Sequence, residues 1–216
     1  TNCFEMIKEY DYLRFPKESG YRGIHLIFQY CGKCEEFKGL KIETQVRSKI
    51  QHYWATAVEI VGTFTGQQLK AGFGNEELLR FFKLVSELLD DFENARPSRT
   101  ELVKEIKELD EKLRIIEKLK TYSVITDFTE SIEKNTGRFL LQLNINEQTT
   151  KIIHFRQKEL KEATEEYINS EQKYQKDNVD IVLIEAKSIQ ELKKGYPNYF
   201  ADSTAFIHQL SSLIGV

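Results

Sequence analysis

Residues 16–25 read PKESGYRGIH, and residues 40–47 read LKIETQVR. The first segment is a basic turn in which Gly20 and Gly23 permit positive φ angles or the close approach of a ligand. Residues 24–30 are rich in branched and aromatic side chains, which predicts a strand. Residues 40–47 alternate apolar and polar side chains, which predicts the returning strand of a hairpin. We expect the rest of the chain to be organised around this turn and hairpin.

The returning strand carries its charged side chains on one face. That face holds Lys41, Glu43, Gln45 and Arg47, and the other holds Leu40, Ile42, Thr44 and Val46. If the two strands share an apolar face, His25 lies on the same side as Glu43. One hypothesis is a surface that handles phosphate and metal. The other is a half-exposed sheet with a solvated charged face, and periodicity alone favours it.

The composition is that of a globular chain without a global basic field. The chain has 216 residues, of which 40% are hydrophobic, so it suits one large domain or two small ones and is not disordered. Its net charge of −3 means that any phosphate binding must be local. It has no run of about 18 apolar residues and no signal-peptide core near its start. Three cysteines do not make a disulfide framework. We expect a cytoplasmic protein with no membrane partner.

Two helices are predicted after the hairpin. Residues 1–9, before it, are weakly patterned and are interpreted as a helix end. Ser48 is the candidate N-cap of a helix whose apolar stripe follows the 3.6-residue period. His52 lies on an adjacent face, where a single histidine is more often structural than catalytic. The pattern of residues 76–93 predicts a second helix. Its apolar stripe is wide enough for the helix to be buried on more than one side.

Arg96-Pro97 is the clearest boundary, and it divides the chain into residues 1–96, 97–122 and 123–216. Ser98 and Glu101 fit a capping box at the start of a long helix. The apolar residues of that helix then follow a heptad seam, at positions 102, 106, 109, 113 and 116. Packing of the seam against the first domain is the favoured interpretation. A homo-oligomer formed through residues 98–120 is the alternative.

Residues 123–216 predict a small α+β module in the order β-β-α-β-α-α. Strands are expected at 139–143, 151–155 and 180–186, and helices at 159–174, at 188–194 and after Asp202. No residues in the module have catalytic spacing, and His154 and His208 lack partner motifs. The aromatic cluster at residues 196–200 is typical of a packing corner, with a partner surface as the alternative.

Several segments resemble the synthetase domain of the RelA/SpoT family, the alarmone pyrophosphokinases. The matching residues are Asp11-Tyr12, Pro16-Lys17, SGYRGIH at 19–25, IETQVR at 42–47 and HYWA at 52–55. They follow the family's order and spacing over residues 10–95, which is less than half of the chain. Small stand-alone members, including toxic ones, are the most similar, because no hydrolase domain precedes the match.

The resemblance implies both a fold and an activity. The fold is a nucleotidyltransferase-like mixed sheet flanked by helices, followed here by the long helix and the α+β module. The activity is GTP pyrophosphokinase chemistry, in which the terminal pyrophosphate of ATP is transferred to a ribose 3′-hydroxyl with Mg²⁺. In most members the acceptor is GDP or GTP, which gives the (p)ppGpp alarmones of the stringent response. In some toxic members the acceptor is the 3′ end of tRNA.

The resemblance implies nucleotide contacts from the basic turn and the strand after it. Tyr21 matches the aromatic residue that stacks on the acceptor base. Lys17, Arg22 and His25 match contacts to the acceptor phosphates. An aromatic face supports base stacking, and lysine and arginine neutralise phosphate oxygens.

The resemblance places the catalytic residues on the returning strand. Glu43 matches the carboxylate that helps to hold Mg²⁺ and orients or deprotonates the attacking hydroxyl. Gln45 and Arg47 match the neighbours that place it, and Lys41 and His52 are additional candidates. Carboxylate oxygen is a ligand that Mg²⁺ prefers, and phosphoryl-type transfer relies on positioning and charge neutralisation.

Two departures from the family pattern bear on activity. The family's basic ATP-binding segment and its second metal-binding aspartate lie upstream of the acceptor motif, and neither is recognised in this sequence. Only Glu43 of the usual carboxylate pair is present. We therefore expect the chain to lack an upstream segment, and expect this polypeptide alone to bind ATP poorly and to have little synthetase activity.

Three other hypotheses remain from the sequence. A non-catalytic protein that senses nucleotides and contacts other proteins is consistent with the same sheet. An RNA-binding module has the basic turn in its favour but lacks an overall basic charge. Cys31 and Cys34 have the spacing of a zinc half-site, which Cys3 and His25 would have to complete. Two incidental thiols in a hairpin loop are the favoured interpretation.

Overall fold

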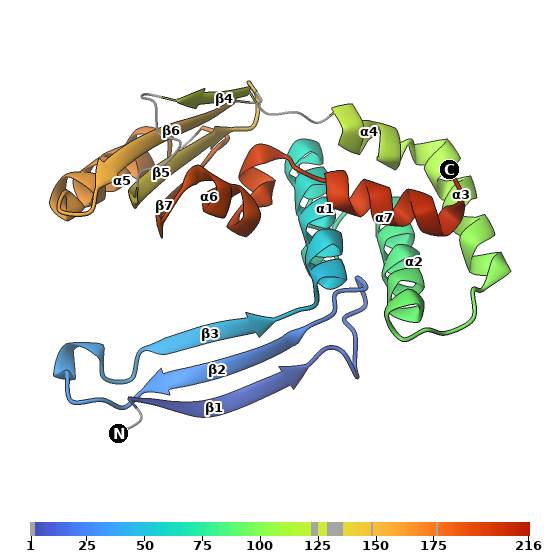
Figure 1. The fold of residues 1–216 in the computed structure, drawn as a ribbon, viewed down its shortest axis with the longest axis horizontal. Coiled ribbons are helices and arrows are strands. Elements are labelled where there is room, and N and C mark those ends of the chain that lie inside the picture. Colours follow the sequence, from blue (N-terminus) through green and yellow to red (C-terminus); the bar gives the residue numbers. More distant parts are fainter. Residues whose placement is uncertain (1–2, 122–124, 129–135, 148, 176) are drawn as a thin grey trace.

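The computed structural model describes residues 3–121, 125–128, 136–147, 149–175 and 177–216. Its first sheet is antiparallel in the order β1-β2-β3, formed by β1 (Phe4–Asp11), β2 (Ile24–Tyr30) and β3 (Lys41–Val46) (Figure 1). A 3₁₀ turn, η1 (Glu35–Phe37), lies in the connection between β2 and β3. The predicted hairpin is confirmed. The interpretation of residues 1–9 as a helix end is wrong, because Phe4 to Asp11 pair along β2.

The first sheet extends away from the helices and meets them at the end where β3 leads into the first helix (Figure 1). Ile42 is 48% exposed and Val46 is 49% exposed, so the apolar face of β3 is not a buried core face. His25 pairs with Gln45, and Ile27 pairs with Glu43. This register puts His25, Glu43 and Gln45 on one face, as the period-two pattern predicts.

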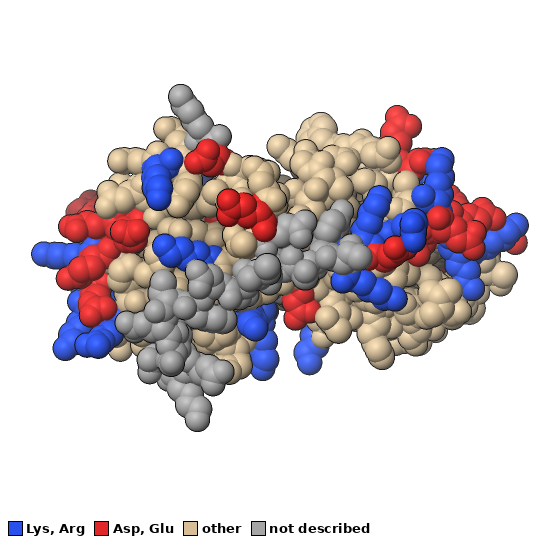
Figure 2. Space-filling model, turned by 90° about the horizontal axis from the view of Figure 1, so that it is seen from above, with Lys and Arg blue, Asp and Glu red and all other residues tan. Residues whose placement is uncertain are grey.

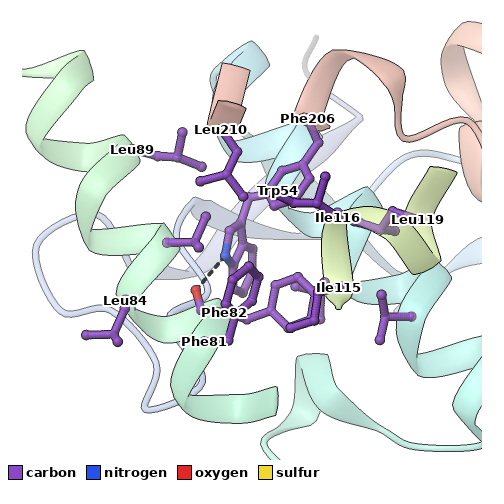
Figure 3. Packing of buried hydrophobic residues seen from close by; sticks show 14 of the residues in the cluster. Trp54, Phe81, Phe82, Leu84, Leu89, Ile115, Ile116, Leu119, Phe206 and Leu210 are labelled. Atoms are coloured by element: carbon purple, nitrogen blue, oxygen red, sulfur yellow. Dashed lines mark hydrogen bonds between the residues drawn. The ribbon is translucent and has the colours of Figure 1, made fainter. Parts of the chain in front are cut away.

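Helices α1 (Lys49–Thr65) and α2 (Glu76–Glu93) form the centre of the larger core. Ser48 caps α1 in a capping box with Gln51, which confirms the predicted N-cap. Asn75 caps α2, and the 3₁₀ turn η2 (Leu69–Ala71) lies between the two helices. Trp54 of α1 donates a hydrogen bond to the Phe82 carbonyl oxygen of α2 at 2.8 Å, among buried aromatic and aliphatic side chains (Figure 3).

The predicted long helix is two helices, α3 (Thr100–Leu113) and α4 (Ile115–Thr121). Arg114 separates them with a positive φ of 53°, a conformation that ends an α-helix. The predicted Ser98 capping box is also wrong, because Arg99 is the N-cap residue and makes no side-chain cap. The Arg99 guanidinium instead bonds Asp91 of α2. Leu102, Ile106 and Ile116 are buried in the chain's own core, so the seam packs within the chain, as favoured.

The second sheet has the order β4-β6-β5-β7. Its strands are β4 (Ile125–Phe128), β5 (Gly137–Asn144), β6 (Thr149–Arg156) and β7 (Val179–Ala186). Strand β5 pairs antiparallel with β6 and β7, and β4, which was not predicted, pairs parallel with β6. The predicted α+β class is thus confirmed, with the mixed sheet in the second half and an antiparallel sheet in the first.

The second sheet has its own helices and its own core. Helix α5 (Leu160–Lys173) follows β6, and α6 (Ile189–Gly195) and the 3₁₀ turn η3 (Pro197–Phe200) follow β7. Tyr199 is buried in this second core, and its carbonyl oxygen accepts a hydrogen bond from Thr150 at 2.6 Å. The aromatic cluster at residues 196–200 is therefore a packing corner, as predicted.

The last helix, α7 (Thr204–Ile214), leaves the second sheet and packs against α1, α3 and α4. Its residues Phe206, Leu210 and Ile214 belong to the larger core, with Phe206 and Leu210 beside Trp54 (Figure 3). The predicted grouping of this helix with the module at 123–216 is therefore wrong. Periodicity identified the helix but carried no information about which core it joins.

Two further properties concern the helices and the surface charge of the described chain. No helix in the described part of the chain is long and apolar enough to cross a membrane. On the face seen in Figure 2, lysine and arginine side chains lie among aspartate and glutamate side chains. This mixture agrees with the net charge of −3 and restricts phosphate binding to local groups of cations.

Candidate functional site

The connection between β1 and β2 folds back over α2 and carries the basic turn. Gly20 has a φ of +91°, and a Cβ at this position would lie 3.0 Å from Lys83 Cα of α2. The Ser86 hydroxyl of α2 donates a hydrogen bond to the Gly20 carbonyl oxygen at 2.5 Å, and the Ser19 hydroxyl donates one to the Lys70 carbonyl oxygen at 3.2 Å. These contacts fix the turn and direct Tyr21 inward.

Four side chains, Tyr21, His25, Glu43 and Gln45, form a closed hydrogen-bonded circuit, here called the four-residue circuit. His25 Nδ1 lies 2.7 Å from Glu43 Oε1, and Gln45 Nε2 donates to Glu43 Oε2 at 3.0 Å. The Tyr21 hydroxyl lies 2.7 Å from His25 Nε2 and 3.4 Å from Gln45 Oε1. His25, Glu43 and Gln45 are therefore neighbours in the structure, as the strand pattern predicted.

Glu43 is the carboxylate of this group. The hydrogen bonds from Gln45 and from His25 hold the pKa of its carboxyl group below the ordinary value. Its side chain is 45% exposed, so it is ionised at neutral pH and open to solvent. Each oxygen accepts one hydrogen bond from the protein and retains a second lone pair for a ligand.

Three cations surround the circuit. The Lys17 ammonium lies 4.7 Å from the centre of the Tyr12 ring and 5.2 Å from that of Tyr21. The Lys70 ammonium lies 5.6 Å from the Tyr21 ring and is paired with Glu59 of α1. Arg47 packs against the turn, 3.0 Å from where a Cβ of Gly23 would lie. The structure thus brings the predicted Lys17 within electrostatic reach of Glu43, and the predicted Arg47 within reach of Tyr21.

Lys70 and Glu59 were not predicted as site residues. Glu59 of α1 pairs with Lys70, eleven residues later, and no sequence pattern predicts that pair. His52 itself faces Arg47, Glu59 and Lys70. Burial, and then Arg47, lower the pKa of its imidazole, so His52 is neutral at neutral pH.

Three of the predicted site residues, Tyr21, Arg22 and Lys41, do not lie where they were expected. Tyr21 is 1% exposed, so its ring presents no free face for a nucleobase in this arrangement, and stacking on the acceptor base stays a prediction. Arg22 points to the other side of the turn, 3.5 Å from Asp90, where it lines a cavity of about 580 Å³ with Arg96 and Arg99. Lys41 pairs with Gln29, farther along the sheet from His25.

The carboxylate oxygens of Glu43 suit Mg²⁺ better than a metal that needs several protein ligands. Among the described residues no group of three or more His, Cys, Asp and Glu side chains is arranged to hold a metal ion. Cys31 and Cys34 thus stay a half-site within that part of the chain. Mg²⁺ typically takes one or two protein carboxylates and completes its shell with water and substrate phosphates. Glu43, with two open lone pairs near the ammonium group of Lys17, fits that requirement.

Comparisons with known proteins find 13 similar chains among solved structures, three of which are described below. No protein-family model matches the sequence, and no curated protein matches it. Small alarmone synthetase 1 from Bacillus subtilis, bound to its product pppGpp, is 23% identical with a TM-score of 0.38, over 44% of this chain and 47% of that chain. Small alarmone synthetase 2 from Bacillus subtilis is 22% identical with a TM-score of 0.36, over 44% of this chain and 51% of that chain.

A GTP pyrophosphokinase family protein from Streptococcus pneumoniae is 20% identical with a TM-score of 0.36, over 55% of each chain. The resemblance found in the sequence is thus found again among solved structures. The chain spans about half the length of the structures it matches. With TM-scores below 0.4, these similarities carry no argument about activity, which has to rest on the site residues.

Proposed function

We propose that the end of the first sheet, with the turn at residues 16–23 and helix α1, is the acceptor side of a nucleotide pyrophosphokinase site. The reaction is Mg²⁺-dependent transfer of pyrophosphate from ATP to the 3′-hydroxyl of GDP or GTP. The observation that carries the proposal is Glu43, an exposed carboxylate held by His25 and Gln45 within a group of cations.

The cations supply the phosphate contacts in this proposal. Lys17 rests on the rings of Tyr12 and Tyr21, which hold an ammonium group only weakly at an exposed position, at about 0.5–1 kcal/mol. A nucleotide phosphate would draw Lys17 away because the charge of a phosphate is full, whereas a ring offers only a quadrupole. Lys70 is paired with Glu59 and would add a second, less mobile cation. Arg47, with its planar guanidinium, offers a bidentate contact.

Glu43 holds the metal and the acceptor hydroxyl in this proposal. Its lowered pKa makes it a weak base at neutral pH, so ligation of Mg²⁺ and orientation of the hydroxyl suit it better than proton abstraction. Mg²⁺, when bound, would neutralise charge on the transferred phosphoryl group. His25 and Gln45 keep the carboxylate in one orientation. The entropic cost of orienting it is therefore not part of the reaction barrier.

A non-catalytic nucleotide sensor is the second candidate, and one observation favours it. Glu59, the other carboxylate facing the circuit among the described residues, is paired with Lys70, which leaves Glu43 alone to hold a metal. One carboxylate supports Mg²⁺ binding together with nucleotide phosphates but gives slow transfer at best. The two candidates share the binding site and differ in turnover.

A transfer assay separates these candidates. The chain is incubated with ATP labelled at the γ-phosphate, Mg²⁺ and either GDP, GTP or tRNA, and labelled products are resolved. We expect slow, acceptor-dependent product formation with GDP or GTP that Glu43→Gln abolishes, while nucleotide binding persists. Binding without any product would favour the sensor. Equal turnover by Glu43→Gln would refute the role of Glu43, and label on tRNA alone would refute the acceptor.

A further inference from the structure

The three cysteines of the chain lie together at the end of the first sheet that is far from α1. Cys3 precedes β1, and Cys31 and Cys34 follow β2, all as exposed thiols. The backbone N–H of Cys31 donates a hydrogen bond to the Cys3 carbonyl oxygen at 2.8 Å. The next pair along the strands is Phe4 with Tyr30. The antiparallel ladder therefore continues by one more pair, in which Cys3 lies directly opposite Cys31.

The backbone pairing of Cys3 with Cys31 suits a disulfide. Antiparallel residues whose backbone groups bond each other have Cα atoms about 5.5 Å apart, and disulfides most often join Cα atoms about 5.5–6 Å apart. Directly opposite residues also carry their side chains on the same face of a sheet. The neighbouring pair shows this, because the rings of Phe4 and Tyr30 meet edge to face with their centres 5.4 Å apart. Cys3 and Cys31 share the other face.

Cys34 is not placed to compete for Cys31. The chain after Cys31 turns over the ring of Tyr30, where a Cβ at Gly32 would collide with the Tyr30 hydroxyl oxygen. The backbone N–H of Cys34 donates to that same hydroxyl at 3.4 Å. Because side chains alternate along a strand, Tyr30 lies on the face opposite to the side chain of Cys31. The turn therefore carries Cys34 to the face away from the Cys31 thiol, although two residues separate them in the sequence.

We propose that Cys3 and Cys31 are a modification site, at which glutathione disulfide oxidises the two thiols to a reversible disulfide. The thiolate of one cysteine attacks glutathione disulfide, forms a mixed disulfide and releases one glutathione. The thiolate of the other cysteine attacks the mixed disulfide, forms the bond between the two cysteines and releases the second glutathione. The protein loses two hydrogen atoms, and glutathione disulfide is reduced to two glutathione molecules. This inference does not depend on the proposed transfer reaction.

The disulfide would fasten β1 to β2 at the open end of the sheet. The helices meet the first sheet at its other end (Figure 1), so the strand pairing at the cysteine end lacks their support. A cross-link between the strands removes conformations from the unfolded ensemble and thereby stabilises the pairing. Because β2 also carries His25, oxidation would couple the stability of a strand of the candidate site to the thiol–disulfide balance.

The test treats the whole folded chain with glutathione disulfide at neutral pH, blocks the remaining thiols by alkylation and locates disulfides by peptide mass spectrometry. We expect a Cys3–Cys31 disulfide in the parent and in the control Cys34→Ser, and its loss on addition of dithiothreitol. In Cys3→Ser, a Cys31–Cys34 disulfide should form at least about tenfold more slowly, because the fold does not hold that pair in register. The same treatment in urea should remove the preference for Cys3–Cys31.

Amide hydrogen exchange supplies the second readout. Oxidation of the parent should slow exchange in β1 and β2, and the same treatment of Cys31→Ser should leave it unchanged. A Cys31–Cys34 disulfide as the main product of the folded parent would overturn the inference. So would glutathione adducts on Cys3 and Cys31 without a bond between them, or the same products in urea as in the folded chain. Unchanged exchange after oxidation would refute the effect on the sheet.

Discussion

Among single residues, the hydrogen bonds that hold Glu43 decide what the candidate site can do. The period-two pattern of residues 40–47 predicted that His25, Glu43 and Gln45 share a face, because side-chain alternation is a local property of a strand. The hydrogen bonds among them depend on register and on the inward direction of Tyr21, which the packing of Gly20 against α2 decides. That packing is a tertiary contact, so the sequence pattern did not predict the burial of Tyr21.

Gln45→Ala tests the electrostatics of Glu43. Gln45 makes the largest contribution to the lowered pKa of this carboxyl group, so the substitution should raise that pKa toward its ordinary value. The sign follows from linkage: a lowered pKa contributes stability above the ordinary carboxyl range, and that stability is lost as pH falls through the folded-state value. Carbon-13 NMR titration of the Glu43 carboxyl group measures the shift.

Gln29→Ala serves as the control for that titration, because Gln29 lies on the same strand pair but outside the circuit. Its substitution should leave the Glu43 titration unchanged. If Gln45→Ala also left it unchanged, the hydrogen bond from Gln45 would not hold Glu43 in solution.

At the scale of elements, helix positions were predictable and their ends and partners were not. The 3.6-residue period located α1, α2 and α7, since an apolar stripe identifies a helix that packs against something. The break at Arg114 has no signal in a heptad pattern, because a positive φ there arises where α4 turns to reach the core. Likewise, Arg99 begins α3 through its ion pairs with α2, which a capping-box pattern does not anticipate.

Ile106→Ala tests the packing of α3. Ile106 is fully buried in the chain's own core, so loss of its side chain should cost about 2–5 kcal/mol of the free energy of unfolding. Chemical denaturation measures that loss, with Glu111→Ala as an exposed control on the same helix. A dimer seam would instead leave monomer stability nearly unchanged and lower the mass in sedimentation, and that result would contradict the packing described here.

At the scale of the whole molecule, two cores are joined by the turn at residues 196–201. Tyr199 belongs to the core of the second sheet, while Ala201 and helix α7 belong to the core built on α1 and α2. The candidate site lies where the first sheet meets that larger core (Figure 1). The end of the chain therefore supports the helix that carries His52 and Glu59, a connection that no local pattern predicts.

The most direct test of the central claim is calorimetric titration of the whole chain with GDP, with and without Mg²⁺. We expect Mg²⁺ to tighten GDP binding by about tenfold or more in the parent, equivalent to roughly 1.4 kcal/mol. We expect the same gain in Glu36→Gln, a control in the connection between β2 and β3. We expect no gain in Glu43→Gln, whose metal-free binding should persist. An equal gain in Glu43→Gln, or no GDP binding by the parent, would contradict the claim that Glu43 marks an acceptor-nucleotide site.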